Sequence, residues 1–311
     1  MNSEELKKPM AIAITGGIVI SFAPVLYIVS GANPLTGAFF RMLYALPFLG
    51  LIIWFRGMGD SRSINTRLIA LLAGIVFSLD FVSYHSAIDW IGTGIGTLIG
   101  NSQVIIVTLM SWWLFGEKPN FSILVSLPIV MIGLFLISGL WDDDPYGSYP
   151  VRGVIAGVFT AIFYSGFLII FRFANRDLAP ASNLQFDSTA GCALGLLILS
   201  FLPLQTIHIE SINFTPTWPI HGWLLLLAFL SQVVGWLAIA YSLPRLPAAY
   251  TSFAILLQPV LTIIWGVILL AESPSLQQSI GMFLILGSII GVTVYGSVDS
   301  SSEALDSTKV L

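Results

Sequence analysis

Three charged residues and two glutamines stand inside long stretches of otherwise uncharged sequence. Arg41, Asp80 and Asp187 each interrupt an apolar stretch, and Gln103 and Gln258 occupy the middle of two others. A charge in the middle of a membrane-spanning helix costs about 2.5–3.5 kcal/mol on insertion scales, so it is usually paired or functional. A primary amide offers two donors and two acceptors without a charge. These side chains fit the binding of a small polar ligand, or the exchange of a proton.

The composition indicates that lipid, rather than water, surrounds most of the chain. Of the 311 residues, 56% are hydrophobic and 9% are charged, whereas a soluble domain carries about 25% charged residues. The net charge of −4 gives no reason to expect nucleic acid as a partner, and the single Cys192 excludes an internal disulfide. The sequence contains no nucleotide-binding loop, no serine-hydrolase motif and no metal-ligand spacing, so we expect no enzyme, no cofactor and no metal site.

Ten stretches are long and apolar enough to cross a bilayer, because a spanning helix needs about 20 apolar residues. They are Met10–Ser30, Pro34–Phe55, Thr66–Ala87, Ile91–Phe115, Pro119–Gly139, Gly153–Ala174, Pro180–Pro203, Ile220–Leu243, Pro247–Leu270 and Leu276–Gly296. Continuous apolarity argues against a transmembrane barrel, whose strands alternate in polarity. The predicted fold class is an all-α membrane protein with ten transmembrane helices.

One segment of the chain occurs twice. Residues 86–121 align without a gap on residues 241–276, so that Gln103 falls on Gln258. Self-similarity at a fixed offset is the mark of an internal structural repeat. The aligned glutamines lie in the fourth and ninth predicted spans.

The predicted spans divide into two groups of five around a polar outer linker over residues 140–152. An odd number of spans makes the second group cross the membrane in the opposite sense to the first. The sequence therefore predicts two inverted-topology five-helix repeats, 10–139 and 153–296, as in many secondary transporters. The charged and serine-rich residues 297–311 are predicted to form a disordered cytoplasmic tail.

Basic residues predict the orientation of the chain. With the N-terminus inside, the basic residues that face the cytoplasm are Lys7, Lys8, Arg56, Arg62, Arg67, Lys118, Arg172, Arg176, Arg245 and Lys309. Only Arg152 then faces outward, while Arg41 lies within a span. Short cytoplasmic loops are enriched in Lys and Arg, so we predict that both termini are cytoplasmic and that the protein lies in the plasma (inner) membrane.

Short motifs in both halves resemble a known family. The first half contains Phe39–Arg41 and Gly116–Pro119, and the second contains Leu257–Pro259 and Ala271–Glu272. In combination they resemble an EamA-type member of the drug/metabolite transporter superfamily, over nearly the whole chain. The resemblance implies ten helices, an inverted repeat and transport of small organic metabolites, often outward. This chain has Val104 where a proline commonly follows the glutamine, so the two halves need not break their helices alike.

Depth along the predicted spans groups the candidate site residues. At a rise of about 1.5 Å per residue, Gln103 and Gln258 lie about 18 and 16 Å from the starts of their spans, near the midplane. Arg41 and Asp80 lie about 10 and 12 Å from the outer ends of adjacent antiparallel spans. We predict that Arg41 and Asp80 form an ion pair, and the alternatives are that Asp80 exchanges a proton or that Arg41 binds a substrate carboxylate.

Further residues join the predicted substrate-binding set. Gln232 and Trp236 are four positions apart, so on an α-helix they share a face, and with Tyr164 they would form an apolar wall with a few polar groups. Asn101 and Tyr241 complete the set.

Asp187 lies about 10 Å from the inner end of its span. Only Arg172 and Arg176 are near it among the cations of the second half. The sequence leaves open whether Asp187 exchanges a proton or reaches the water at the interface.

Two further features have structural interpretations. Gly92, Gly96 and Gly100 lie at four-residue spacing, a small-residue seam that lets helices approach closely. Glu117 and Glu272 each close a helical hairpin, where we predict that the carboxylate caps the next helix.

These observations predict a secondary active transporter that works by alternating access around a midplane cavity. We expect it to export small organic metabolites, such as amino acids or amphipathic drugs, with protons as a candidate coupling ion. The expected partners are the lipid bilayer and the small-molecule substrate. The alternatives are an uptake carrier for sugar or nucleotide-type metabolites and a channel or receptor-like membrane protein.

Overall fold

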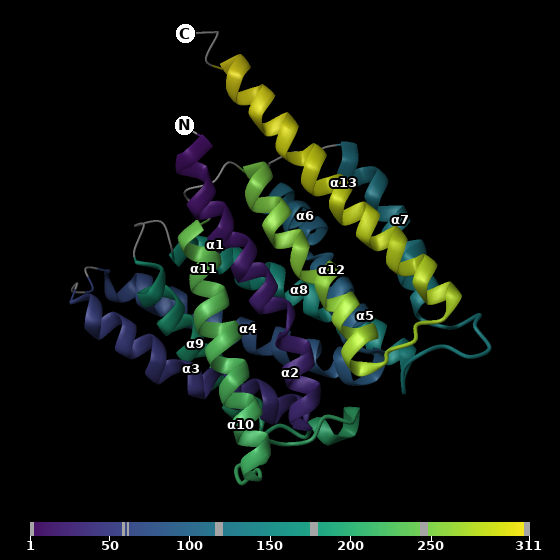
Figure 1. Ribbon diagram of the computed structural model, residues 1–311, viewed down its shortest axis with the longest axis horizontal. Coiled ribbons are helices and arrows are strands. Elements are labelled where there is room, and N and C mark those ends of the chain that lie inside the picture. Colours follow the sequence, from purple (N-terminus) through teal and green to yellow (C-terminus); the bar gives the residue numbers. More distant parts are fainter. Residues whose placement is uncertain are drawn as a thin grey trace.

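A computed structural model describes residues 3–57, 60, 62–115, 121–174, 180–242 and 248–307 (Figure 1). All the regular elements over these residues are helices. The prediction of an all-α fold is therefore confirmed for the part of the chain that the structure describes.

The first half of the chain contributes seven helical elements to the described structure. They are α1 (Ser3–Ser21), α2 (Ala23–Ser30), α3 (Pro34–Arg56), α4 (Ile64–Ile91), α5 (Thr93–Asn101), α6 (Gln103–Phe115) and α7 (Phe121–Ile137). After the loop over residues 138–149, the second half forms α8 (Pro150–Ala174), α9 (Ala181–Leu199), the 3₁₀ turn η1 (Leu204–Ile207), α10 (Trp218–Leu227), the π-helix η2 (Ala228–Gly235), α11 (Trp236–Ser242), α12 (Ala248–Leu270) and α13 (Leu276–Ser307).

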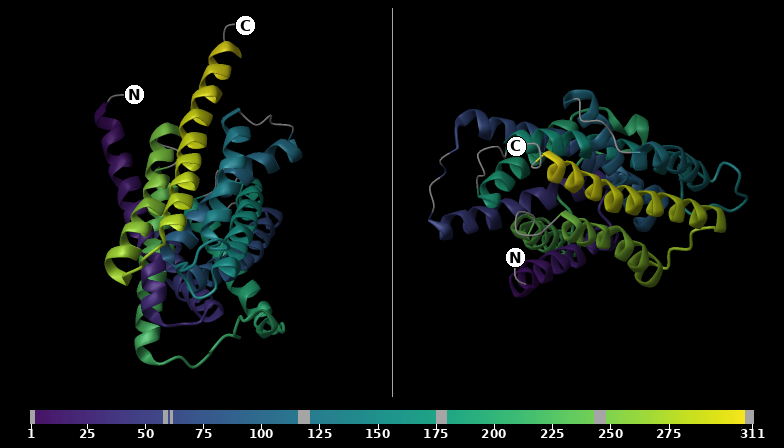
Figure 2. Two further views of the ribbon diagram at one scale, coloured as in Figure 1. Left: turned by 90° about the vertical axis from the view of Figure 1, so that its right-hand side faces the viewer. Right: turned by 90° about the horizontal axis from the view of Figure 1, so that it is seen from above.

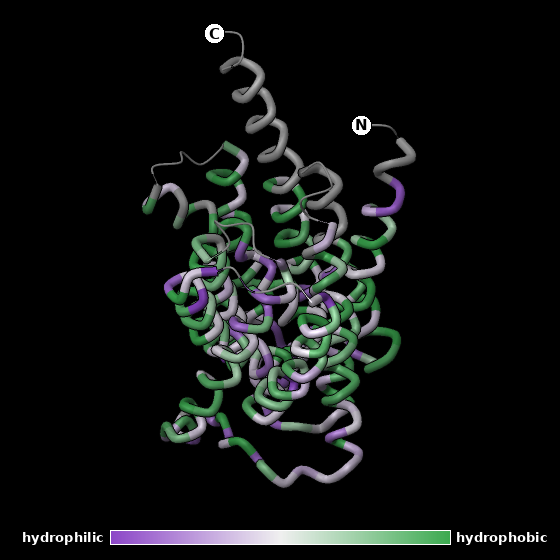
Figure 3. Tube along the Cα trace, turned by 90° about the vertical axis from the view of Figure 1, so that its left-hand side faces the viewer, coloured by the Kyte–Doolittle hydropathy of each residue, from purple (hydrophilic) through white to green (hydrophobic). Residues whose placement is uncertain are grey.

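Six helical segments of the described residues are long and apolar enough to cross a membrane. They are Lys7–Ser30, Pro34–Arg56, Ile64–Ile91, Thr93–Leu114, Pro150–Phe171 and Trp218–Ile239, and shorter apolar helices cover Phe121–Ile137, Leu257–Leu270 and Leu276–Val292. Large apolar side chains such as Trp54, Phe121 and Phe283 are at least 72% exposed, and hydrophobic residues dominate the bundle (Figure 3). The chain is thus a multi-pass membrane protein with lipid-facing apolar surfaces.

Helix interruptions fall near the middle of the bundle. The first span breaks at Phe22, before Pro24, as expected where a proline removes a backbone donor. The fourth breaks at Ser102, whose hydroxyl donates to the carbonyl of Ile99 at 2.6 Å. By contrast, α12 is continuous through Pro259. The two glutamine-bearing spans therefore differ. The fourth span, which has no proline after Gln103, is interrupted, whereas α12, which has Pro259 after Gln258, is continuous.

Helix α4 runs through the centre of the bundle and packs along α8 and α9 (Figure 1). A Cβ atom on Gly74 would lie 2.0 Å from the carbonyl oxygen of Ser188, and one on Gly191 would lie 2.0 Å from that of Leu71. Only glycine allows α4 and α9 to approach this closely. The small-residue seam predicted at Gly92, Gly96 and Gly100 is also close-packed at Gly100, where a Cβ atom would lie 2.9 Å from the side chain of Thr160.

The first and last helices both point toward the same end of the bundle, which we call the terminal end (Figures 1 and 2). Helix α13 continues as far as Ser307, into the residues for which the sequence predicted disorder. Residues 297–307 contain neither proline nor glycine, so nothing in them stops a helix that has already formed.

Candidate functional site

A cavity of about 100 Å³ lies inside the bundle, between helices of both halves. The predicted site residues that line it are Arg41, Asp80, Asn101, Gln103, Tyr164, Trp236 and Gln258. They come from seven different helices, so no single element makes the site. The predicted residues that do not line the cavity are Gln232, Tyr241 and Asp187.

Arg41 and Asp80 are the charged residues of the cavity, and their side chains are buried at 4% and 5% exposure. The predicted direct ion pair between them is not formed in the described structure. Arg41 instead donates from Nη2 to the hydroxyl of Ser231 at 2.8 Å. Its guanidinium lies 4.7 Å from the ring centre of Phe81, a cation–π contact.

Polar atoms of both charged side chains remain without a partner. Nε of Arg41 and Oδ1 of Asp80 are buried and make no hydrogen bond to another described residue. The hydroxyl of Thr160, also on the cavity wall, has no partner either. Buried polar groups are normally satisfied, and one that lines a cavity is expected to meet a ligand or water there.

Tyr84 and Thr97 add hydroxyl groups to the wall, and their oxygens are 2.8 Å apart. Asn101 donates from Nδ2 to the carbonyl of Thr97 at 2.8 Å, which fixes the direction of its amide. Sequence reasoning missed Thr97 and Thr160. A threonine in an apolar helix gives no signal by itself, since its hydroxyl usually bonds to a carbonyl of the same helix.

Aromatic side chains form one side of the cavity. Phe77 stacks on Tyr164 with ring centres 5.8 Å apart and on Phe167 with ring centres 4.0 Å apart. Phe81 meets Phe77 edge to face at 4.5 Å. The site therefore combines a flat apolar wall with a cation, an anion and several amide and hydroxyl groups, as metabolite pockets do.

Gln232 and Trp236 were predicted to share one wall, but only Trp236 lines the cavity. Residues 228–235, which include Gln232, form a π-helix, whose hydrogen bonds run from i to i+5, and Trp236 begins α11 directly after it. Trp236 lines the cavity, whereas the side-chain amide of Gln232 donates to the hydroxyl of Thr189 in α9 at 3.5 Å, and the backbone carbonyl of Gln232 accepts from Gln185. Gln232 ties η2 to α9, and Tyr241 lies at the end of α11 away from the cavity wall.

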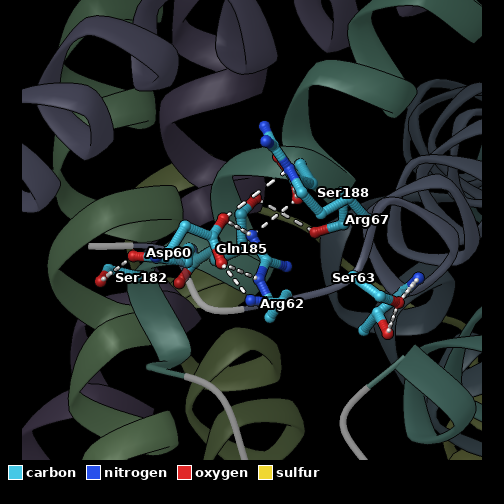
Figure 4. Close-up of polar contacts among 10 residues, drawn as sticks. Asp60, Arg62, Ser63, Arg67, Ser182, Gln185 and Ser188 are labelled. Atoms are coloured by element: carbon cyan, nitrogen blue, oxygen red, sulfur yellow. Dashed lines mark hydrogen bonds and ion pairs between the residues drawn. The ribbon is translucent and has the colours of Figure 1, made fainter. Parts of the chain in front are cut away.

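Among the described residues, Asp187 pairs with cations of the first half of the chain. Its carboxylate lies 2.7 Å from Nη2 of Arg62 and 3.5 Å from Nε of Arg67. Figure 4 shows Arg62 and Arg67 beside the first turns of α9. Arg176 lies outside the described residues, as does the side chain of Arg172.

Asp60 completes this charged cluster. Arg62 donates to both of its carboxylate oxygens, at 2.9 and 2.8 Å (Figure 4). These hydrogen bonds lower the pKa of Asp60 to about 2. The cluster joins the connection between α3 and α4 to α9 at the terminal end, and it is separate from the cavity.

Glu272 caps a helix, but not the one that follows it. Its Oε1 accepts from the backbone N–H and the hydroxyl of Thr93 at 2.5 and 2.7 Å, and its Oε2 accepts from the N–H of Gly94 at 3.1 Å. These donors begin α5, in the other half of the chain. The counterpart Glu117 lies outside the described residues.

Three comparisons with known proteins agree with this architecture. The model of the EamA-like transporter family matches residues 8–139 and again residues 151–294. The chain is 25% identical to the "Uncharacterized transporter sll1319" of Synechocystis sp. over 80% of this chain and 76% of that protein. It is 22% identical to the "Uncharacterized transporter YxxF" of Bacillus subtilis over 86% of this chain and 84% of that one.

A solved crystal structure superposes with a TM-score of 0.58 at 16% identity, over 93% of this chain and 97% of that chain, which shows a shared fold. The relatives are named transporters rather than enzymes. Since the family model covers most of both halves, the chain belongs to the EamA-like transporter family, within the drug/metabolite transporter superfamily.

Proposed function

We propose that this protein is a secondary active transporter that exports a small zwitterionic metabolite, with amino acids as the first candidates. The proposal rests on two buried charged residues, Arg41 and Asp80, which line one cavity without forming an ion pair. A ligand with a carboxylate and an ammonium group would give each of them a counter-charge. A charge-assisted hydrogen bond is roughly twice as strong as a neutral one, so both ends of such a ligand would be recognised.

The size and lining of the cavity support a compact ligand. Its volume of about 100 Å³ is small beside the roughly 300–1,000 Å³ of pockets for drug-sized ligands. The stack of Phe77 and Tyr164 offers an apolar face for a side chain, while the amides of Gln103 and Gln258 can bond to polar atoms. This combination favours an amino acid over an amphipathic drug and over a sugar.

Helix packing supports two inverted repeats of five spans, which we include in the proposal. Helix α4 packs on α8 and α9, and its counterpart α10–η2–α11 packs on α1 and α3. Helix α3 packs on its own counterpart α9, and α7 packs on its own counterpart α13. Exchange of the halves therefore preserves these packed pairs. Two halves related in this way can rock about a central site and expose it to either side.

The charge distribution supports an orientation with both termini in the cytoplasm. The start of α1, which carries Lys7 and Lys8, lies at the terminal end, whereas the loop between α7 and α8 at the other end carries Asp142–Asp144 (Figure 1). The positive-inside rule places the basic end in the cytoplasm of a plasma membrane.

Counterflow in proteoliposomes tests the proposal. Protein-loaded vesicles that contain unlabelled phenylalanine should take up labelled phenylalanine against its gradient. They should take up neither phenethylamine, which lacks the carboxylate, nor 3-phenylpropionate, which lacks the ammonium group. Saturable counterflow supports a carrier, since a channel would show none. Absence of counterflow for every amino acid tried would overturn the proposed substrate class.

Substitutions test which charged group of the ligand Arg41 and Asp80 each bind. Arg41→Gln should weaken phenylalanine counterflow at least about tenfold, the equivalent of ~1.4 kcal/mol, because the carboxylate loses its partner. Asp80→Asn should weaken it similarly through the ammonium group. Thr189→Val is a matched control, because Thr189 is buried and polar but faces Gln232 rather than the cavity. An equal loss in Thr189→Val would show that the effects come from damaged folding.

Proton coupling by Asp80 is a second candidate role, favoured by the unpartnered Oδ1 atom on the cavity wall. The same variant separates the two roles. If Asp80 carries the proton, Asp80→Asn keeps counterflow at the affinity of the parent protein but loses accumulation driven by a pH gradient. If Asp80 binds the ammonium group, both activities fall together.

A further inference from the structure

Two clusters of contacts join the halves of the chain at opposite ends of the bundle. The first, which we call the ionic clasp, consists of Asp60, Arg62 and Arg67 from the first half, which are labelled in Figure 4, and Asp187 from the second half. Arg62 is its centre, because it lies 2.8 Å from Asp60 and 2.7 Å from Asp187 and its side chain is only 2% exposed. Arg67 adds longer contacts, 3.7 Å to Asp60 and 3.5 Å to Asp187.

The second cluster, which we call the cap clasp, lies at the end away from the termini. Glu272 follows α12 in the second half and accepts three hydrogen bonds from Thr93 and Gly94, which begin α5 in the first half. Glu272 is 6% exposed. A carboxylate at a helix N-terminus is favoured both by the free N–H groups and by the helix dipole.

The two clasps lie on either side of the cavity. On α4, Arg67 of the ionic clasp is about 20 Å along the helix from Asp80 of the cavity wall. On α5, Thr93 of the cap clasp precedes the cavity residue Asn101 by about 12 Å. The two clasps therefore lie toward opposite ends of α4, with the cavity between them.

We propose that the ionic clasp and the cap clasp are the two alternating gates of this protein. Opening the cavity to the terminal end requires the separation of Asp187 from Arg62, and opening to the other end requires the release of Glu272 from α5. This inference uses the alternating-access mechanism of the proposed function and adds the residues that hold each gate. Each gate joins one half of the chain to the other, as a contact that breaks when the halves rock must do.

The two gates differ in chemistry, and this difference has a testable consequence. In the ionic clasp, the central Arg62–Asp187 pair is buried, but Arg67, which also contacts Asp187, is 47% exposed, so dissolved salt weakens that outer contact. The cap clasp is buried and pairs a carboxylate with backbone donors, which salt screens much less. Salt should therefore weaken the terminal gate through Arg67 and leave the cap clasp unchanged.

The test measures from which side a cysteine in the cavity can be labelled. The parent protein for the assay carries Ala23→Cys, a small residue of the cavity wall, in a Cys192→Ala background that removes the natural thiol. A membrane-impermeant maleimide is added to right-side-out or to inverted vesicles, and the labelling rate is measured from each side. The assay requires no substrate and no transport.

Asp187→Asn should raise the labelling rate from the terminal end about tenfold, which corresponds to ~1.4 kcal/mol, and should not raise it from the other end. Glu272→Gln should give the reverse pattern, so each variant is the matched control of the other. Rates that rise equally from both ends in both variants would show a loosened bundle and would overturn the assignment of gates. Unchanged rates would overturn it as well.

Two further measurements keep the test valid if a variant folds poorly. Raising salt to about 0.5 M should increase labelling from the terminal end in the unsubstituted clasp, and should have no further effect in Asp187→Asn. Arg62→Gln combined with Asp187→Asn should raise the labelling rate no further than Asp187→Asn alone, because both changes remove the same contact between the halves. If the labelling rates change as expected but no counterflow is found, only the proposed function is refuted. If the protein transports its substrate but the variants do not change the labelling rate from one side selectively, only the assignment of the gates is refuted.

Discussion

Replacing Gly74 with alanine should force α4 away from α9 and destabilise the whole bundle. The added Cβ atom would lie 2.0 Å from the carbonyl oxygen of Ser188 and 2.7 Å from the backbone nitrogen of Cys192. An ordinary contact is about 3.4 Å, so the backbones must separate by roughly 1.4 Å. Both clashing atoms are backbone, so no side chain can rotate to make room.

The cost follows from overpacking a well-packed interface. Such changes cost about 1–3 kcal/mol, and the backbone clash at Gly74 belongs at the upper end of that range. For a chain of this size, a loss of 3 kcal/mol lowers the unfolding temperature by roughly 5–10 °C. Transport should fall as well, since α4 carries Asp80 on the cavity wall.

Cys192 supplies the assay, because it is the only cysteine of the chain and is fully buried. A thiol-reactive dye that fluoresces on reaction reports the temperature at which the detergent-solubilised protein unfolds. Gly222→Ala on α10 is the matched control, because a Cβ atom there meets nothing within 4 Å. The control should melt at or slightly above the parent temperature. If Gly74→Ala melts within about 1 °C of the parent, the close approach of α4 and α9 is refuted.

Three shorter predictions follow from other contacts. Gln278→Ala should lower the unfolding temperature, since this fully buried amide bonds to the N–H and the carbonyl of Tyr146 at 2.8 and 2.9 Å; an unchanged temperature would contradict it. Tyr84→Phe should leave folding intact but weaken substrate binding about fivefold, measured by ligand-dependent thermal shift, because the cavity loses a hydroxyl. Mild acid should spare the contact between Asp60 and Arg62: with the pKa of Asp60 lowered to about 2, its contribution is complete above the unfolded value of about 3.9 and is lost only as pH falls toward 2, so the drop in unfolding temperature caused by Asp60→Asn should be the same at pH 5 and at pH 7.

The sequence was sufficient for the all-helical membrane fold, because that prediction rests on long apolar stretches and on few charges. It was also sufficient to select residues such as Arg41, Asp80 and Gln258, since a polar group inside an apolar span stands out by contrast. The structure places these three on one cavity. Thr97 and Thr160, which are ordinary in an apolar helix, gave no such contrast.

Partners across the fold were the information that the sequence lacked. Estimates of depth put Arg41 and Asp80 at one level, but could not show that Ser231, about 190 positions away, would bind the guanidinium. The same limit applies to Asp187. Its described partners Arg62 and Arg67 are about 120 positions away in the sequence, so no local pattern indicates them.

The environment of Gln232 was another feature that spacing alone could not predict. Gln232 belongs to the π-helix η2 and donates to Thr189 of α9, whereas Trp236 begins α11 and lies on the cavity wall. The same π-helix carries Ser231, whose hydroxyl accepts the hydrogen bond from Nη2 of Arg41. Because Arg41 is bonded to Ser231 and forms no ion pair with Asp80, a counter-charge for the Asp80 carboxylate can come from a ligand in the cavity.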